Sequence, residues 1–159
     1  KSLRIGDFVE LADGLLGEVR EINIRSTLLR TLDNADIIVP NADFISSQVN
    51  NWTLNDDIRR FSINFSVAYG SDLEQVREAG LKAAEEVSIT LKREGIMPDV
   101  LVTELGSSGV ECILTIWAQG EWVKRPGWVK SRYLTAIYNN LRAAEIEIPF
   151  PQMDVHMRN

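Results

Sequence analysis

The residue types that most often carry chemistry are sparse in this chain. His156 is the only histidine, and it lies two residues after Asp154. A metal or proton-relay site built on this pair would need further ligands from elsewhere. A Ser–His–Asp arrangement would have to use the same histidine near the end of the chain. We therefore interpret His156 as a surface histidine.

Other short motifs also lack the surroundings that their chemistry needs. Gly106–Gly109 has the composition of a phosphate loop, but a strand pattern follows it where a phosphate loop needs a helix N-terminus. Cys112 falls on the apolar face of that strand pattern, which is typical of a buried, inert thiol. The pairs Asp56–Asp57 and Glu85–Glu86 are typical of solvated charges. The sequence predicts no enzyme, no cofactor and no metal site.

One stretch interleaves aromatic and basic side chains: Trp117, Trp122, Lys124, Arg125, Trp128, Lys130 and Arg132. Such residues can stack on nucleic-acid bases, but they also dominate protein–protein interfaces. The net charge of −6 disfavours binding to phosphates. We therefore expect a subunit or domain interface here and no nucleic-acid partner, and we keep a soluble, RNA-binding module as the alternative.

Composition sets the broad class. The 159 residues, 45% hydrophobic and 25% charged, suit one medium or two small globular domains. No apolar run approaches the roughly 20 residues that cross a bilayer, so we expect a soluble piece of a longer protein. The single cysteine suits a reducing compartment. Residues 1–57 carry 5 basic and 10 acidic side chains, whereas residues 58–159 carry 12 and 13, so the acidity is concentrated in the first third.

Residues 1–57 predict a small β domain of the SH3/Sm-like barrel kind. Short apolar runs with turn residues between them indicate several strands within about fifty residues. Ile22, Ile24, Ser26 and Leu28 recur with period two and predict one strand face. Asp33–Asn34 predicts a turn before Ile37–Val39, a β-branched strand that Pro40 ends. The polar residues 50–57 predict the domain boundary.

Residues 58–159 predict a ferredoxin-like β-α-β-β-α-β domain. Strict alternation from Phe61 to Tyr69 indicates the first strand. Ser71 and Glu74 form a capping-box pattern for a helix that we expect to stop at Gly95. Two strands joined at residues 106–109 follow, then a helix that begins at Pro126. Residues 148–157 predict the last strand.

With these elements placed, the chain resembles the cytoplasmic portion of the small-conductance mechanosensitive channel (MscS) family. Four stretches carry the resemblance, in the family's order: Leu3–Val9; Arg25–Thr31 followed by Asp36–Asn41; Phe65–Asp72; and Ile148–Arg158. The resemblance implies a membrane-tension-gated pore that releases ions and small osmolytes under osmotic stress. It also implies a homo-oligomeric ring, usually a heptamer, on the cytoplasmic face of the bacterial inner membrane, and transmembrane helices upstream of residue 1.

The resemblance also implies roles for particular residues. Leu3, Arg4, Gly6 and Asp7 would form the junction with the pore-lining helix. Pro40 and Asn41 would shape a corner of the β domain at a subunit contact.

Acidic residues of the first domain are candidate vestibule charges. If Glu10, Glu18 and Glu21 face the vestibule, their repetition around a ring would concentrate cations there.

Overall fold

The structure, a computed structural model, describes residues 3–158. The chain packs into two compact units. The first holds the residues up to Arg59 together with Gln119–Arg125, and the second holds Arg60–Ala118 together with the residues from Pro126 onward. Gln119–Arg125 therefore packs within the first unit, although it lies between two elements of the second. The domain limits 1–57 and 58–159 remain our proposal.

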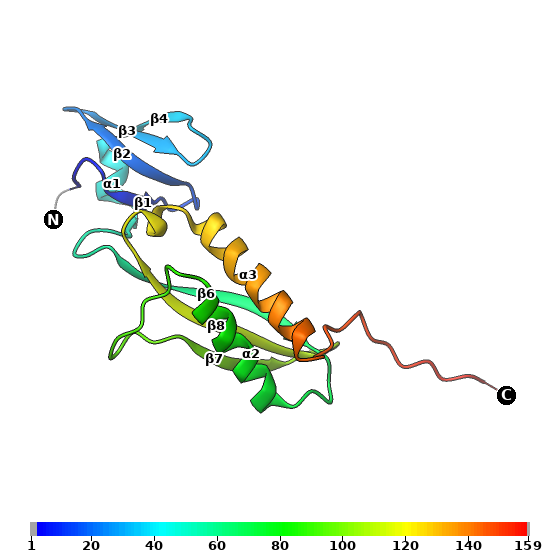
Figure 1. Cartoon of the computed structure of the whole chain (residues 1–159). Coiled ribbons are helices and arrows are strands. Elements are labelled where there is room, and N and C mark those ends of the chain that lie inside the picture. Colours follow the sequence, from blue (N-terminus) through cyan, green and yellow to red (C-terminus); the bar gives the residue numbers. More distant parts are fainter. Residues whose placement is uncertain (1–2, 159) are drawn as a thin grey trace. The chain divides into compact units, whose positions relative to one another are not determined.

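The first unit is a five-stranded sheet with strand order β4-β3-β2-β1-β5 and one short helix (Figure 1). Every neighbouring pair in it is antiparallel. Its elements are β1 (Phe8–Glu10), β2 (Leu16–Ile22), β3 (Ser26–Thr31), β4 (Asp36–Pro40), α1 (Asn41–Ser46) and β5 (Asn50–Asn51).

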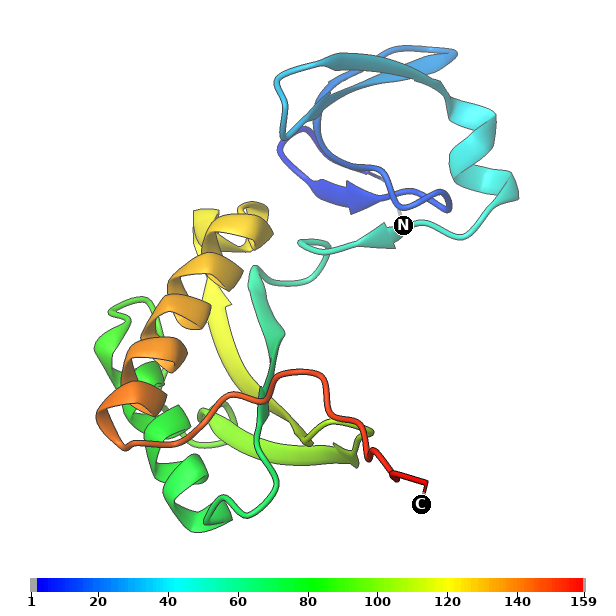
Figure 2. The same cartoon turned by 90° about the vertical axis from the view of Figure 1, so that its right-hand side faces the viewer.

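The core of the first unit takes one buried side chain from each of four strands: Val9, Val19, Leu29 and Val39. The strands of this sheet are strongly curved (Figure 2). The predicted turn is confirmed, since Asn34 adopts a φ of 64° between β3 and β4. The single strand face predicted for Ile22–Leu28 is wrong. The chain reverses direction between β2 and β3, and Ile24 at that turn is 96% exposed.

The second unit is a three-stranded sheet of order β6-β8-β7 with two helices on one face (Figures 1 and 2). Its elements are β6 (Ile58–Val67), which begins in the first unit, α2 (Leu73–Glu86), β7 (Asp99–Leu105), β8 (Val110–Gln119) and α3 (Pro126–Ala143). The 3-10 turn η1 (Gly120–Lys124) joins β8 to α3 and packs with the first unit.

The two-residue alternation of the sequence places the core of the second unit. Ile63 and Val67 of β6, and Cys112, Leu114 and Ile116 of β8, are buried beneath the helices. The helices contribute further buried residues at helical spacing: Val76 and Ala83 from α2, and Val129, Tyr133, Ile137 and Leu141 from α3.

Both ends predicted for α2 are displaced. Asp72, not Ser71, is the N-cap, because its carboxylate accepts a hydrogen bond from the Glu74 N–H at 3.0 Å. The helix ends at Glu86, well before Gly95. The β-branched residues that follow disfavour a helix, and the Ala84 carbonyl accepts hydrogen bonds from the Val87 N–H at 3.3 Å and from the Thr90 hydroxyl at 2.7 Å.

The fold class, small β sheet followed by an α+β unit, is confirmed, but the predicted last strand is wrong. Residues 148–157 are extended and form no strand with any of residues 3–158. Pro149 and Pro151 have no N–H to give to a ladder. A hydrogen bond from Ala68 N–H to the Glu147 carbonyl at 2.8 Å holds the chain just before the segment, and one from Gln152 N–H to the Ser108 hydroxyl at 3.1 Å holds the segment itself. Of the helices within residues 3–158, none is long and apolar enough to cross a membrane.

Candidate functional site

The predicted junction segment, Leu3–Asp7, is a tight turn fixed to the first unit. Gly6 has a φ of 95°, a left-handed conformation that glycine adopts without steric cost. The Gly6 N–H donates to the Val19 carbonyl at 2.8 Å, and the Asp7 N–H donates to the Arg4 carbonyl at 3.0 Å. Leu3 packs against the core of the unit. The four predicted junction residues therefore act together as one structural element.

A buried carboxylate anchors this turn. The Asp7 side chain accepts hydrogen bonds from the Arg4 N–H at 2.9 Å, the Asn51 side-chain amide at 3.0 Å and the Thr53 hydroxyl at 3.2 Å. Asp7 is only 5% exposed, and an ionised carboxylate survives burial only where donors replace water. The network ties the start of the unit to its last strand.

Arg4 makes a second tie between the same two segments. Its guanidinium donates to the Leu54 carbonyl at 2.9 Å, next to the Thr53 that serves Asp7. The sequence pattern did not identify Asn51 or Thr53, because it assigned residues 50–57 to a boundary loop. Two polar residues two positions apart at the end of a strand do not by themselves indicate a hydrogen-bond network. The role of Asn51 and Thr53 is apparent only beside their partner, Asp7.

The predicted corner at Pro40 and Asn41 is a second hydrogen-bonded hub. Pro40 ends β4, and Asn41 begins α1. The Asn41 side-chain carbonyl accepts from the Thr27 hydroxyl at 2.7 Å, while its amide donates to the carbonyls of Asn23 and Ile24 at 3.0 and 3.1 Å. One side chain therefore satisfies three polar groups of the β2–β3 hairpin, which only an amide with both donors and an acceptor can do.

The junction and the corner line one cleft of the first unit. Its volume is about 440 Å³, and its walls include Leu3 and Leu54 from the junction side and Thr27, Asn41 and Phe44 from the corner side. The apolar side chains of this cleft offer packing, and the Thr27 hydroxyl and the Asn41 amide offer hydrogen bonding. The cleft contains no nucleophile and no acid–base pair. The cleft suits contact with another segment of protein.

The three candidate vestibule charges differ in their surroundings. Glu10 accepts a hydrogen bond from the Trp52 indole at 3.3 Å. Arg59 stacks over the Trp52 ring at 3.4 Å, and its burial lowers the pKa of its guanidinium while Glu10 opposes that effect. Glu18 pairs with Lys124 at 3.0 Å. Glu21 is exposed and accepts only a 3.4 Å hydrogen bond from Asn23. Of the three, Glu21 is the one most open to solvent.

The residues that were expected to carry no catalytic or metal-binding role lie in ordinary structural positions. His156 and Asp154 are exposed on the extended C-terminal segment, and residues 3–158 contain no cluster of three His, Cys, Asp or Glu side chains that could hold a metal ion. Cys112 is buried, and burial raises the pKa of its thiol. Gly106–Gly109 forms the β7–β8 hairpin turn, and the Glu86 carboxylate accepts from Asn140 at 2.8 Å.

The aromatic and basic stretch is divided between the two units. Trp122 and Lys124 belong to η1 in the first unit. Trp128 and Arg132 belong to α3 in the second, where the Arg132 guanidinium lies 5.0 Å from the centre of the Trp128 ring. Residues of the stretch therefore belong to both units.

Comparison with known families covers nearly the whole chain. Residues 1–54 match the profile of the "Mechanosensitive ion channel, beta-domain", and residues 61–148 match that of "Mechanosensitive ion channel MscS, C-terminal". The mechanosensitive channel MscK of Escherichia coli is 36% identical over the whole chain, which spans 14% of that protein. The small-conductance mechanosensitive channel of Edwardsiella ictaluri is 33% identical over 99% of the chain, which spans 52% of its length.

Solved structures of mechanosensitive channels have the same fold as this chain. The crystal structure of Helicobacter pylori MscS in its closed state superposes with a TM-score of 0.84, at 29% identity, over 99% of this chain and 60% of that one. Arabidopsis thaliana MSL1 shares the fold with a TM-score of 0.68 over 93% of this chain and 53% of its own, at 13% identity. The chain thus spans about half or less of the curated relatives named here. It belongs to the MscS family of mechanosensitive ion channels.

Proposed function

We propose that this chain is the cytoplasmic vestibule part of a membrane-tension-gated channel, and that it carries no catalytic activity. In the complete protein, transmembrane helices upstream would form the pore. Copies of the chain, seven in our expectation, would form a ring below it on the inner face of the bacterial cell membrane. Ions and small osmolytes would pass through the vestibule that the ring encloses.

The observation that carries this proposal is the Asp7 network. A segment that must transmit force between a pore helix and a folded unit has to be attached at more than one point. The turn Leu3–Asp7 is attached through Asp7 to Asn51 and Thr53, and through Arg4 to Leu54. A buried carboxylate that accepts three hydrogen bonds makes this turn a firm point of attachment.

The corner at Pro40 and Asn41 fits a subunit contact in such a ring. The cleft beside it is open and lined by apolar side chains, among them Phe44 and Val49. Exposed Ile38 and Ile45 lie on the neighbouring elements β4 and α1. Apolar side chains at an open cleft are typical of a surface that a partner covers.

A weak preference for cations would follow if Glu21 faces the vestibule. Repetition of one carboxylate around a ring raises the local cation concentration. Neutralisation by Glu21→Gln should then move the reversal potential in a salt gradient toward zero. An unchanged reversal potential would remove Glu21 from the permeation path.

A pressure-ramp patch-clamp recording tests the function itself. The complete protein would be expressed in a membrane stripped of its own mechanosensitive channels. We expect stretch-activated currents that disappear when residues 3–158 are deleted, with surface labelling to show that both proteins are inserted. An inserted complete protein that stays silent at all pressures up to patch rupture would overturn the proposal.

A further inference from the structure

The second unit is electrically asymmetric across its sheet. One lateral side consists of α3 and the part of β6 from Arg60 onward, and we call it the cationic side. These segments carry no carboxylate, and their four cations are Arg60, Lys130, Arg132 and Arg142. The other lateral side consists of α2 and β7, and we call it the acidic side. It carries two cations, Arg77 and Lys82, and six carboxylates: Glu74, Glu78, Glu85, Glu86, Asp99 and Glu104.

The two sides lie at opposite edges of the sheet. The strand order β6-β8-β7 makes β6 and β7 the two edge strands. Helix α2 packs over β7, where Gly80 meets Val100, and α3 lies along β6. The excess positive and negative charges of the second unit therefore lie on its two edge strands and on the helix beside each of them.

Three of the four cations of the cationic side have no carboxylate partner within the described part of the chain. Lys130, Arg132 and Arg142 form no ion pair with any of residues 3–158. Two of these guanidinium groups lie over aromatic rings instead, Arg132 over Trp128 at 5.0 Å and Arg142 over Tyr138 at 5.7 Å. A guanidinium held near a ring keeps its N–H edges free for carboxylates.

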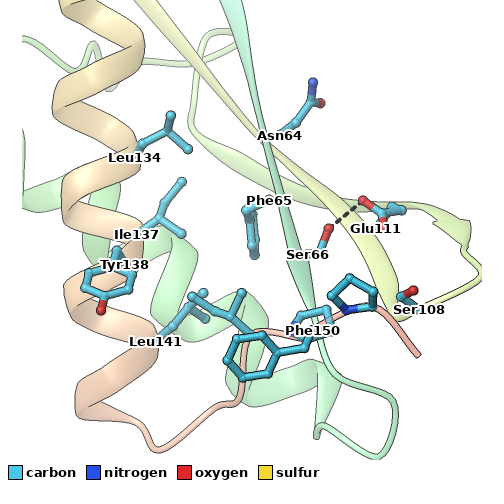
Figure 3. Close-up of a pocket in the computed structure, with 13 residues that line it drawn as sticks. Asn64, Phe65, Ser66, Ser108, Glu111, Leu134, Ile137, Tyr138, Leu141 and Phe150 are labelled. Carbon is cyan, nitrogen blue, oxygen red and sulfur yellow. Dashed lines mark hydrogen bonds between the residues drawn. The ribbon is translucent and has the colours of Figure 1, made fainter. Parts of the chain in front are cut away.

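An apolar groove adjoins these cations. It has a volume of about 520 Å³ and lies between α3, the edge of β6 and the segment at Phe150 (Figure 3). Phe65, Leu134 and Tyr138 form its walls, and the Ser66 hydroxyl donates to Glu111 at 2.6 Å at its polar end. Tyr138 lines this groove and Arg142 lies over its ring, and tyrosine and arginine are enriched at protein–protein hot spots.

The acidic side offers complementary features. Salt bridges neutralise only part of the negative charge on the acidic side. Arg77 pairs with Asp99 at 2.6 Å, and Lys92 pairs with Glu85 at 3.4 Å. Glu74, Glu78 and Glu104 have no cationic partner among residues 3–158. On β7, Leu101, Val102 and Leu105 are all exposed, and an edge strand with three exposed apolar side chains calls for a cover.

We propose that the cationic side of one copy docks on the acidic side of a second copy. The contact is heterologous, because two different surfaces of the same chain meet, and such contacts repeat around a ring. The inference deepens the proposed function by naming the faces that join the copies, and it rests on the ring that the function requires. A second copy is favoured over RNA because the chain itself supplies the matching acidic surface, whereas its net charge of −6 repels phosphates.

Sedimentation velocity over a concentration series tests the contact with the 159-residue chain. The wild type should self-associate, and more weakly as NaCl rises from about 0.05 to about 0.5 M, because salt screens the attraction. The double variant Lys130→Glu/Arg142→Glu should associate at least about tenfold more weakly. Arg20→Glu/Arg30→Glu changes the net charge equally within the first unit, away from the corner at Asn41, and should leave the association unaltered.

Charge swapping distinguishes this contact from any other. Glu74→Lys/Glu104→Lys should also fail to associate alone, but an equimolar mixture with Lys130→Glu/Arg142→Glu should associate again. A chain carrying all four substitutions should recover self-association. Circular dichroism would confirm that every variant is folded.

Three results would overturn the inference: a wild type that stays monomeric throughout the series, a mixture that does not recover, or equal loss of association in the Arg20/Arg30 control. Retention of a monomeric wild type on an RNA column through Lys130 and Arg142 would assign the cationic side to nucleic acid instead. The proposed function is judged separately. Stretch-activated currents without this association would contradict only the docking contact. Association without currents would contradict only the proposed channel function.

Discussion

Asp7 and Asn51 lie 44 positions apart in the sequence, and the Asp7 carboxylate accepts a 3.0 Å hydrogen bond from the Asn51 side-chain amide. The pair joins the junction turn to β5, the last strand of the first unit. Thr53 reinforces the same tie, because its hydroxyl donates to the other carboxylate oxygen at 3.2 Å. A pull on the junction would thus be delivered to β5 as well as to β1, the strand that follows the junction.

The corner hub gives the first prediction. In Asn41→Asp the amide donors become a carboxylate oxygen that faces the carbonyls of Asn23 and Ile24. We expect the free energy of unfolding, measured by urea denaturation, to fall by about 1 kcal/mol, since two backbone carbonyls lose their donors and face a carboxylate oxygen instead. Asn139→Asp, on an exposed position of α3, should change it by less than about 0.5 kcal/mol. Equal effects of the two substitutions would show that Asn41 is no hub.

The second prediction concerns the ion pair that fastens η1 to β2. Lys124 and Glu18 are 3.0 Å apart with side chains 18% and 32% exposed. A double-mutant cycle of Lys124→Met and Glu18→Gln should give a coupling energy of about 1 kcal/mol. The matched pair Lys92–Glu85, 44% and 66% exposed, should couple by less than about 0.5 kcal/mol because solvent screens it. Coupling no larger at Lys124–Glu18 than at this control would contradict the assignment of η1 to the first unit.

Close packing of α2 on β7 gives the third prediction. A Cβ at Gly80 would lie 2.6 Å from Val100 Cγ2, so Gly80→Ala should lower the free energy of unfolding by about 1–3 kcal/mol. Combining it with Val100→Ala should cost less than the sum of the single changes, because the methyl group then has room. Gly127→Ala in α3, where no atom lies within 4 Å, should be neutral or stabilising. Strict additivity would mean that the two residues do not touch.

The fourth prediction is a pH dependence. Burial raises the pKa of the Tyr133 hydroxyl above its usual value of 10.0, although the hydrogen bond with Thr90 opposes this. The folded state then holds a proton that the unfolded state loses first, so the free energy of unfolding should be unaffected below about pH 10 and fall as pH rises beyond it. Tyr133→Phe should remove this part of the slope, whereas Tyr138→Phe, at an exposed position, should keep it. Identical slopes for wild type and Tyr133→Phe would refute the prediction.

Features that depend on residues close together in the sequence were predicted correctly, whereas features that depend on distant residues were missed. Alternation along β6 and β8 and the turn at Asn34 depend on nearby residues, so the pattern predicted them correctly. The missed end of α2 depended on the Thr90 hydroxyl, six residues beyond its acceptor. Asn51 and Thr53 were missed entirely, since their function exists only against Asp7, more than forty residues away. The charge asymmetry of the second unit is visible only after the sheet order places β6 and β7 at opposite edges.

The most direct measurement is a pressure ramp on the complete channel with Asp7→Asn compared with Glu21→Gln. The wild type should open under stretch. Asp7→Asn removes the charge on which three hydrogen bonds converge, so the junction is held less firmly and the activation pressure should fall. Glu21→Gln, which leaves the junction intact, should activate at the wild-type pressure. A wild type without stretch-activated current would contradict the channel assignment, and an Asp7→Asn channel with the wild-type threshold would contradict the role given to the junction.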